Sequence, residues 1–182
     1  MFVVLLDTCV LVPPTLADSL LRLSEAGCFG IRWSDDIFAE LERTLTRMGV
    51  PPSRVDRRLR DMADAFPQAR IEGYAPLIEG LDISESDRHV LAAAIRSEGH
   101  TIVTFNLKDF PPGGLDAWGV TAVHPDEFLL DQLDLHPGKV MSALAHQAAH
   151  YARPSSSVAD ILGRLSRTGL PRFAEQSRRH LA

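Results

Sequence analysis

Residues 2–7 read Phe2-Val3-Val4-Leu5-Leu6-Asp7, a short run of apolar side chains that ends in a carboxylate. Such a run is typical of a strand that is buried on both faces, as in a parallel sheet covered by helices. Further along the chain, strand and helix patterns alternate. Strands are expected near residues 31–33, 69–72, 101–105 and 120–123, with helical patterns between them. This alternation predicts an α/β fold, with a parallel sheet and helices on both of its faces.

The C-terminal part of the sequence has a different pattern. After the break at His136-Pro137-Gly138 it shows only helical periodicity, at about 139–152, at about 157–168 and after Pro171. About 45 residues are too few to hold a core alone. We therefore predict an α/β domain over residues 1–135 and a helical extension over residues 136–182 that packs on it.

Length and composition are those of an ordinary globular chain. The sequence has 182 residues, of which 45% are hydrophobic and 24% charged. No apolar run approaches the roughly 20 residues of a membrane helix, and no basic segment precedes the first apolar run as in a signal peptide. Cys9 and Cys28 give neither a disulfide framework nor a zinc spacing. We predict a cytoplasmic protein that does not bind membranes and keeps both thiols reduced.

The charge is unevenly distributed along the chain. The net charge is −5, yet the segment from Arg43 to Arg60 holds six arginines and one acid, Asp56. A basic segment beside acidic ones suits an enzyme that handles phosphate groups. The alternative is that these arginines only solvate helix faces.

Four acids stand at the ends of local patterns: Asp7, Glu40, Asp87 and Asp109. Acids at the carboxyl ends of parallel strands, or at the starts of the adjoining helices, can meet in one crevice. Such a cluster needs a positive partner to remain ionised. Mg²⁺ or Mn²⁺ bound by carboxylate oxygens supplies that partner. The pattern therefore predicts a metal-dependent phosphodiester hydrolase.

Each acid also has a structural alternative. A helix is expected over residues 85–97, and Ser84-Glu85-Ser86-Asp87 could form a capping box at its start. Glu40 could pair with arginines of its own helix as part of a solvated stripe. Asp109 could form a turn before the sharp bend expected at Pro111-Pro112-Gly113-Gly114. Asp7 has the weakest alternative, because no helix that it could cap is evident after it.

Four motifs of the chain resemble those of the PIN-domain ribonucleases. They are Leu5-Leu6-Asp7-Thr8, Ser34 to Arg43, Asp87-Arg88-His89-Val90-Leu91-Ala92-Ala93-Ala94, and Ile102 to Phe110. Their order matches the family over roughly residues 2–130. The segment Gly169-Leu170-Pro171-Arg172-Phe173 resembles the helical extension of some VapC-type toxins.

The resemblance implies a three-layer α/β/α sandwich and dependence on Mg²⁺ or Mn²⁺. It implies cleavage of structured RNA such as tRNA or ribosomal RNA, inhibition by a VapB-type antitoxin, and a homodimer. Asp7, Glu40 and Asp87 match the three acids of the family. At the fourth position this chain has Asn106 where many members have Asp, so that Asp109 is an alternative fourth carboxylate.

The roles expected from the resemblance follow residue by residue. Asp7 and Asp87 would bind one cation directly, and Glu40 and Asp109 would bind it through water or complete a second site. Two threonines would orient these carboxylates by hydrogen bonds, Thr8 and Thr104. Three basic side chains are candidate contacts to RNA phosphates: Arg43, Arg47 and Lys108.

Two other functions fit parts of the pattern. The first is a non-catalytic module on the same fold that binds RNA or the antitoxin, and the second is a small-molecule phosphatase. The phosphatase is disfavoured because Asp7-Thr8-Cys9 lacks the second acid of an Asp-x-Asp motif.

Overall fold

The computed structural model describes residues 2–97, 99–151 and 156–181. These residues form two compact units. The first, here called the sheet unit, comprises residues 2–12 and 30–123. The second, here called the helical unit, comprises residues 13–29 and 124–181.

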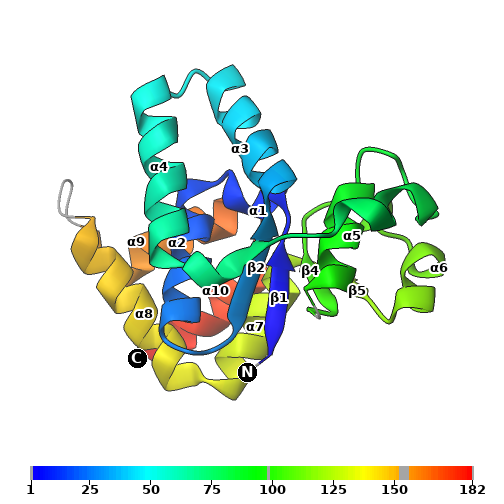
Figure 1. The fold of residues 1–182 in the computed structure, drawn as a ribbon. Coiled ribbons are helices and arrows are strands. Elements are labelled where there is room, and N and C mark those ends of the chain that lie inside the picture. Colours follow the sequence, from blue (N-terminus) through cyan, green and yellow to red (C-terminus); the bar gives the residue numbers. More distant parts are fainter. Residues whose placement is uncertain (1, 98, 152–155, 182) are drawn as a thin grey trace. The chain divides into compact units, whose positions relative to one another are not determined.

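The sheet unit is built on a parallel sheet of five strands in the order β3-β2-β1-β4-β5 (Figure 1). The strands are β1 (Val3–Leu6), β2 (Gly30–Ser34), β3 (Arg70–Ile71), β4 (Thr101–Val103) and β5 (Thr121–Val123). Side chains of the apolar run that opens the sequence lie in the central strand, where Val4, Leu5 and Leu6 are fully buried. The predicted α/β class, with a parallel sheet flanked by helices and further helices toward the C-terminus, is confirmed.

The strand order places a topological switch point beside β1. This strand pairs with β2 on one side and with β4 on the other. The backbone N–H of Asp7, which follows β1, donates to the carbonyl of Val103 at 3.2 Å. In open α/β sheets, functional sites lie outside the carboxyl ends of strands at such a point. Asp7 and the residues after Val103 therefore occupy the edge of the sheet where a site is expected.

Helices of the sheet unit bring further side chains to this edge. They are α1 (Thr8–Leu11), α3 (Asp35–Arg47), α4 (Pro52–Ala65), α5 (Arg88–Arg96) and α6 (Pro112–Leu115), with the short 3₁₀ helix η3 (Leu107–Asp109). As predicted, Ser34 caps α3, and its hydroxyl accepts a hydrogen bond from the N–H of Ile37 at 3.2 Å. α3 packs on β2, α1 and α4, and α5 packs on β1, β2 and β4.

Two local features differ from what the sequence led us to expect. α1 was not expected, because a helix of four residues is too short to show a periodic pattern. α5 begins at Arg88 rather than at residue 85, and no capping box forms, since the Ser84 hydroxyl bonds that of Ser86 at 2.9 Å instead. The sharp turn expected at Pro111-Pro112-Gly113-Gly114 is present, closed by a hydrogen bond from the N–H of Gly114 to the carbonyl of Pro111 at 2.9 Å, and it leads into α6.

The helical unit contains α2 (Pro14–Glu25), α7 (Pro125–Leu135), α8 (Pro137–His150), α9 (Val158–Arg167), α10 (Pro171–Arg178) and the 3₁₀ helix η5 (Arg179–Leu181). A buried polar contact joins α2 to α8: the amide oxygen of Gln147 accepts from the hydroxyl of Ser19 at 2.7 Å. Residue 152, the expected end of the first C-terminal helix, lies outside the described residues. The boundary predicted at residue 135, between an α/β domain and a helical extension, stays a prediction. None of the helices within the described residues has the length and apolar character needed to cross a membrane.

Gly114 gives a prediction about the loop that leads to Asp87. A Cβ at Gly114 would lie 2.5 Å from Cγ2 of Ile83 and 2.9 Å from the carbonyl oxygen of Asp82. Gly114→Ala is expected to lower the free energy of unfolding by about 1–3 kcal/mol, as overpacking does. Gly113→Ala is the matched control, because its Cβ would meet nothing within 4 Å. Urea unfolding of both variants checks this, and equal stabilities would contradict the close packing.

Candidate active site

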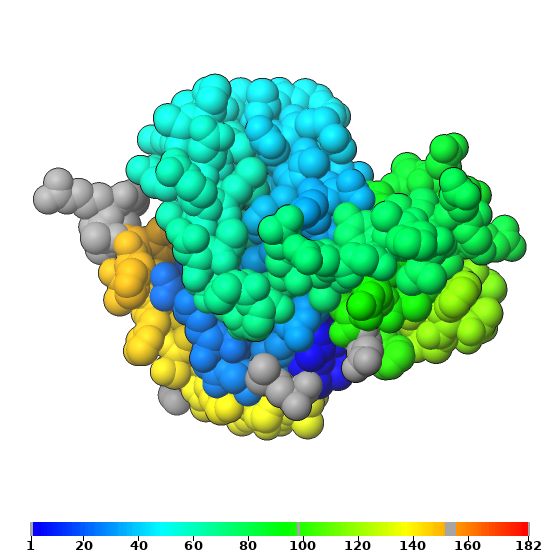
Figure 2. All heavy atoms as spheres, in the orientation of Figure 1, coloured from blue at the N-terminus to red at the C-terminus, as the bar shows by residue number. Residues whose placement is uncertain are grey.

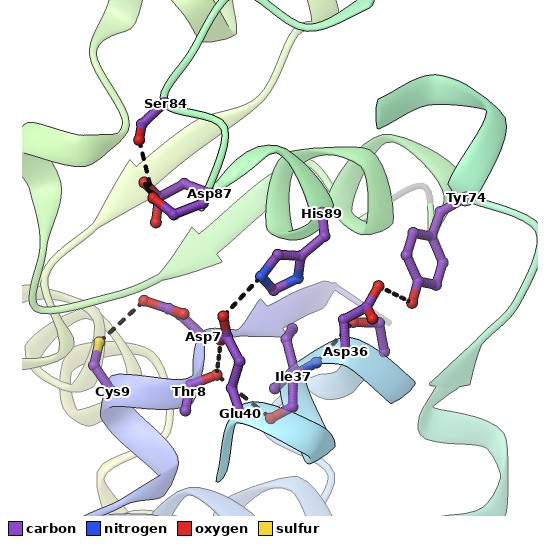
Figure 3. A network of polar contacts seen from close by, with 12 residues as sticks. Asp7, Thr8, Cys9, Asp36, Ile37, Glu40, Tyr74, Ser84, Asp87 and His89 are labelled. Atoms are coloured by element: carbon purple, nitrogen blue, oxygen red, sulfur yellow. Dashed lines mark hydrogen bonds and ion pairs between the residues drawn. The ribbon is translucent and has the colours of Figure 1, made fainter. Parts of the chain in front are cut away.

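The centre of the candidate site is Asp7, whose side chain is only 7% exposed. Its Oδ2 accepts hydrogen bonds from Oγ1 of Thr104 at 2.7 Å and from the thiol of Cys9 at 3.1 Å. Figure 3 shows Asp7, Thr8 and Cys9 side by side at the end of β1. Thr104, which follows β4, thus contacts the carboxylate that sequence analysis expected it to orient.

Burial makes the charged form of Asp7 unfavourable. Loss of solvation raises the pKa of this carboxyl above its ordinary value of 3.8, and the charge of Glu40 raises it further. Hydrogen bonds from Thr104, Cys9 and the backbone of Thr8 oppose the rise without cancelling it. Burial also raises the pKa of the Cys9 thiol to about 12, so this thiol acts as a hydrogen-bond donor rather than a nucleophile.

Glu40, from α3, is held at both of its carboxylate oxygens (Figure 3). Oε2 accepts from Oγ1 of Thr8 at 2.7 Å, and Oε1 lies 3.0 Å from Nε2 of His89. Burial raises the pKa of Glu40, but the hydrogen bonds from His89 and Thr8 and the charge of His89 outweigh it, so the pKa is lowered. The alternative in which Glu40 belongs to a solvated stripe is wrong, because its partners come from α1 and α5.

His89 is a member of the site that the sequence analysis missed. It lies on α5, and its side chain is 14% exposed. Burial lowers the pKa of its imidazole, but the hydrogen bond and charge of Glu40 and the charges of Asp36 and Asp7 raise the pKa overall. Asp36 in turn accepts a hydrogen bond from the hydroxyl of Tyr74 at 2.7 Å. His89 lies inside one of the four quoted motifs, but its sequence context provides no reason to assign it to the site, because its contact depends on α5 facing α3.

The other predicted acids do not join this cluster. Asp87 precedes α5 and forms no side-chain cap, and its Oδ2 accepts from the hydroxyl of Ser86 at 2.9 Å. Asn106 follows β4, and its backbone N–H donates to Oγ1 of Thr104 at 3.0 Å. Asp109 ends η3, where its N–H donates to the carbonyl of Asn106 at 2.9 Å. Across residues 2–97, 99–151 and 156–181, no three His, Cys, Asp or Glu side chains are grouped closely enough to hold a metal ion.

The donor chemistry of the site nevertheless fits a hard divalent cation. Asp7 and Glu40 present carboxylate oxygens, which Mg²⁺ and Mn²⁺ prefer. Burial and the neighbouring charge of Glu40 disfavour ionised Asp7, and a cation would offset both effects. Mutual repulsion keeps several carboxylates from converging without such a charge.

The predicted phosphate contacts are exposed on the sheet unit. Arg43 and Arg47 lie on α3 and, with Ala39, Glu42 and Thr46, line an open groove of about 550 Å³. Arg43 follows Glu40 by three residues on α3, and its positive charge lowers the pKa of Glu40. Lys108 is exposed on η3, next to the segment that carries Asn106.

Comparison with known proteins gives two matches. Residues 125–179 match the family described as VapC50 C-terminal domain. The chain is also 40% identical over 107 residues to the protein named "Putative ribonuclease VapC50" of Mycobacterium tuberculosis (strain ATCC 25618 / H37Rv). That alignment covers 59% of this chain and 63% of the relative, so the chain spans less than two thirds of that protein. No solved structure matches the chain.

The resemblance to VapC-type proteins is confirmed, in the C-terminal helices by the family match and over the longer alignment by the relative. The chain is thus a homologue of the protein named "Putative ribonuclease VapC50", and the similarity to the VapC50 C-terminal domain covers residues 125–179.

Proposed function

We propose that this chain is a Mg²⁺- or Mn²⁺-dependent endoribonuclease that hydrolyses RNA phosphodiester bonds in the cytoplasm. In this proposal it is the toxin of a type II toxin–antitoxin pair, with a VapB-type antitoxin as its inhibitor, and it works as a homodimer. The observation that carries the proposal is the contact cluster of Asp7, Glu40, Thr8 and His89 at the switch point of the sheet. The similarity to the protein named "Putative ribonuclease VapC50" supports it.

The cation would be bound by carboxylates from separate elements: Asp7, Glu40, Asp87 and Asp109, with Asn106 as the alternative fourth ligand. The hydroxyl of Thr104 and the thiol of Cys9 both donate to Oδ2 of Asp7 and would hold this carboxylate in place for the ion. When bound, the ion supplies Lewis acidity toward a water molecule and the phosphate oxygens. Thr8 and Thr104 keep the carboxylates oriented, so that little reorganisation is needed during the reaction.

The exposed face of α3 is the proposed track for the RNA backbone. Arg43 and Arg47 stand four residues apart, which is about 6 Å along a helix, and Glu40 is three residues before Arg43. Two arginines at this spacing can contact neighbouring phosphates while the scissile bond lies at the carboxylates. Figure 2 shows α3 and α4 in cyan with a large exposed surface. Lys108 would contact the strand from η3. Recognition of tRNA or ribosomal RNA would then depend on unpaired, loop-exposed bases.

The direct test is incubation of the purified chain with total cellular RNA and Mg²⁺ or Mn²⁺, with and without a chelator. Discrete fragments that disappear when the chelator is added, and in a parallel lane with Asp87→Ala, are the expected result. RNA that is retained by the protein but stays intact in every lane would contradict catalysis. That outcome would favour the non-catalytic binding module.

Thr104 gives a graded prediction for the same assay. Thr104→Val keeps the shape of the side chain but removes the hydroxyl that donates to Asp7. We expect cleavage and Mn²⁺ affinity to fall by about 10- to 100-fold, as when partners behind metal ligands are lost. Thr104→Ser retains the hydroxyl and should stay within a few-fold of the wild type. Equal rates for Val and Ser would show that this hydrogen bond has no part in the reaction.

A further inference from the structure

Glu40 is clamped by side chains from two elements that are distant in sequence. Thr8, at the start of α1, donates to Oε2, and His89, near the start of α5, contacts Oε1. A glutamate has three rotatable side-chain bonds, and the Glu40 side chain is 31% exposed, so it would otherwise sample several rotamers. Two hydrogen bonds at different oxygens fix both the reach and the plane of the carboxylate.

We propose that His89 is a positioning residue, which holds the Glu40 carboxylate in the orientation needed to bind the divalent cation. This inference rests on the proposed function and assigns a role to a side chain that neither the sequence motifs nor the comparisons single out. Thr8, at the start of α1, fixes one oxygen of the Glu40 carboxylate, and His89, on α5, fixes the other. Without His89, Glu40 could rotate toward solvent and toward Arg43 on its own helix.

The surroundings of His89 argue against a purely structural role. The side chains that follow it on α5, from Val90 to Ala94, are apolar and buried. Nδ1 of His89 is buried and has no hydrogen-bond partner among the described residues. A buried polar atom left unsatisfied costs stability, and such atoms are rare in folded proteins. A leucine at this position would pack against the same apolar neighbours and leave no polar atom unsatisfied. The contact of Nε2 with Glu40 therefore accounts for the imidazole better than packing does.

The two roles predict different metal binding by the His89→Leu variant. If His89 serves packing alone, His89→Leu should leave metal binding intact. If His89 positions Glu40, His89→Leu should leave the protein at least as stable as the wild type while it weakens metal binding. His89→Leu would not leave a buried, unpaired charge at Glu40, because the partly exposed Glu40 carboxylate remains accessible to water.

The test compares His89→Leu, His89→Gln and Glu40→Gln with the wild-type chain. Mn²⁺ affinity is measured by calorimetry, and kcat and KM are measured on the RNA that the wild type cleaves, all at one fixed pH. His89→Leu is expected to weaken Mn²⁺ binding and lower kcat by about 10- to 100-fold, with KM for RNA nearly unchanged. His89→Gln, whose amide N–H can donate to Oε1, is expected to recover most of both. His100→Leu, at an exposed histidine of the sheet unit, is the matched control.

A double variant separates positioning from other effects. Because His89 acts through Glu40, His89→Leu combined with Glu40→Gln should bind Mn²⁺ no more weakly than Glu40→Gln alone. Additive losses, or wild-type Mn²⁺ affinity in a folded His89→Leu variant, would overturn the inference, as would a wild-type chain that binds no Mn²⁺. If the wild type binds Mn²⁺ but cleaves no RNA, the proposed function fails, and the Mn²⁺ affinities still decide the role of His89.

Discussion

Asp7→Asn is expected to reduce RNA cleavage by about 1,000-fold, which corresponds to about 4 kcal/mol of transition-state stabilisation. Asparagine keeps the size of the side chain and one carbonyl oxygen, and it loses the charge that would bind the cation. Initial rates on one defined RNA, at saturating Mn²⁺, measure the effect. Asp61→Asn, at an exposed position of α4, is the matched control and should cleave at the wild-type rate. An Asp7→Asn variant within ten-fold of the wild type would remove Asp7 from the reaction.

The same substitution is expected to stabilise the fold in the presence of a chelator. Burial raises the pKa of Asp7, which means that the folded protein binds a proton more tightly than the unfolded chain does. The ionised carboxylate therefore costs stability at pH values above its folded pKa. That cost disappears as the pH falls below the ordinary value of 3.8, where both states are protonated. Asp7→Asn should thus have a higher Tm than the wild type at neutral pH, and the difference in Tm should disappear in acid. Active sites often lower the stability of a protein in this way in exchange for activity.

Asp126→Ala is expected to lower the free energy of unfolding by about 3 kcal/mol, because it leaves two backbone donors without a partner. Asp126 lies in the first turn of α7 and is 6% exposed. Its Oδ1 accepts from the N–H of Phe173 at 2.8 Å, and its Oδ2 accepts from that of Arg172 at 3.2 Å. These donors belong to the first turn of α10, where a carboxylate also interacts favourably with the helix dipole.

Urea unfolding followed by circular dichroism measures this loss. Asp126→Asn should lose less than alanine, because its amide oxygen can still accept one of the two hydrogen bonds. Asp131→Ala is the matched control, since Asp131 is exposed on the same helix. A loss below 1 kcal/mol for Asp126→Ala would mean that α10 is not held to α7 by this carboxylate.

The sequence predicts the sheet well because its signals are local. The apolar run before Asp7 and the cap at Ser34 can each be recognised from a few neighbouring residues, and the structure confirms both elements. α1 could not be predicted in this way, because four residues carry no period. The start of α5 was misplaced because two hydroxyls, Ser84 and Ser86, bond each other rather than the helix backbone.

The candidate site was predictable only in part. Asp7, Thr104 and Thr8 stand beside strand ends and could be singled out from a sequence alone. The partner of Glu40 could not, because contact with His89 requires that α3 and α5 face each other across 49 positions of sequence. Asp87 and Asp109 remain predicted ligands, because the described residues contain no group of three His, Cys, Asp or Glu side chains close enough to hold a metal ion.

The central claim is that Asp7 and Glu40 form the core of a cation site. A crystal grown with Mn²⁺, measured for anomalous scattering at the manganese edge, tests it most directly. We predict an anomalous peak at about 2.0–2.3 Å from an oxygen of Asp7, with Glu40 bound to the ion directly or through one water. The peak should be absent from crystals of Asp7→Asn. The claim would be contradicted by a peak that is bound to other residues, with no peak at Asp7, in crystals of a protein preparation that cleaves RNA in solution.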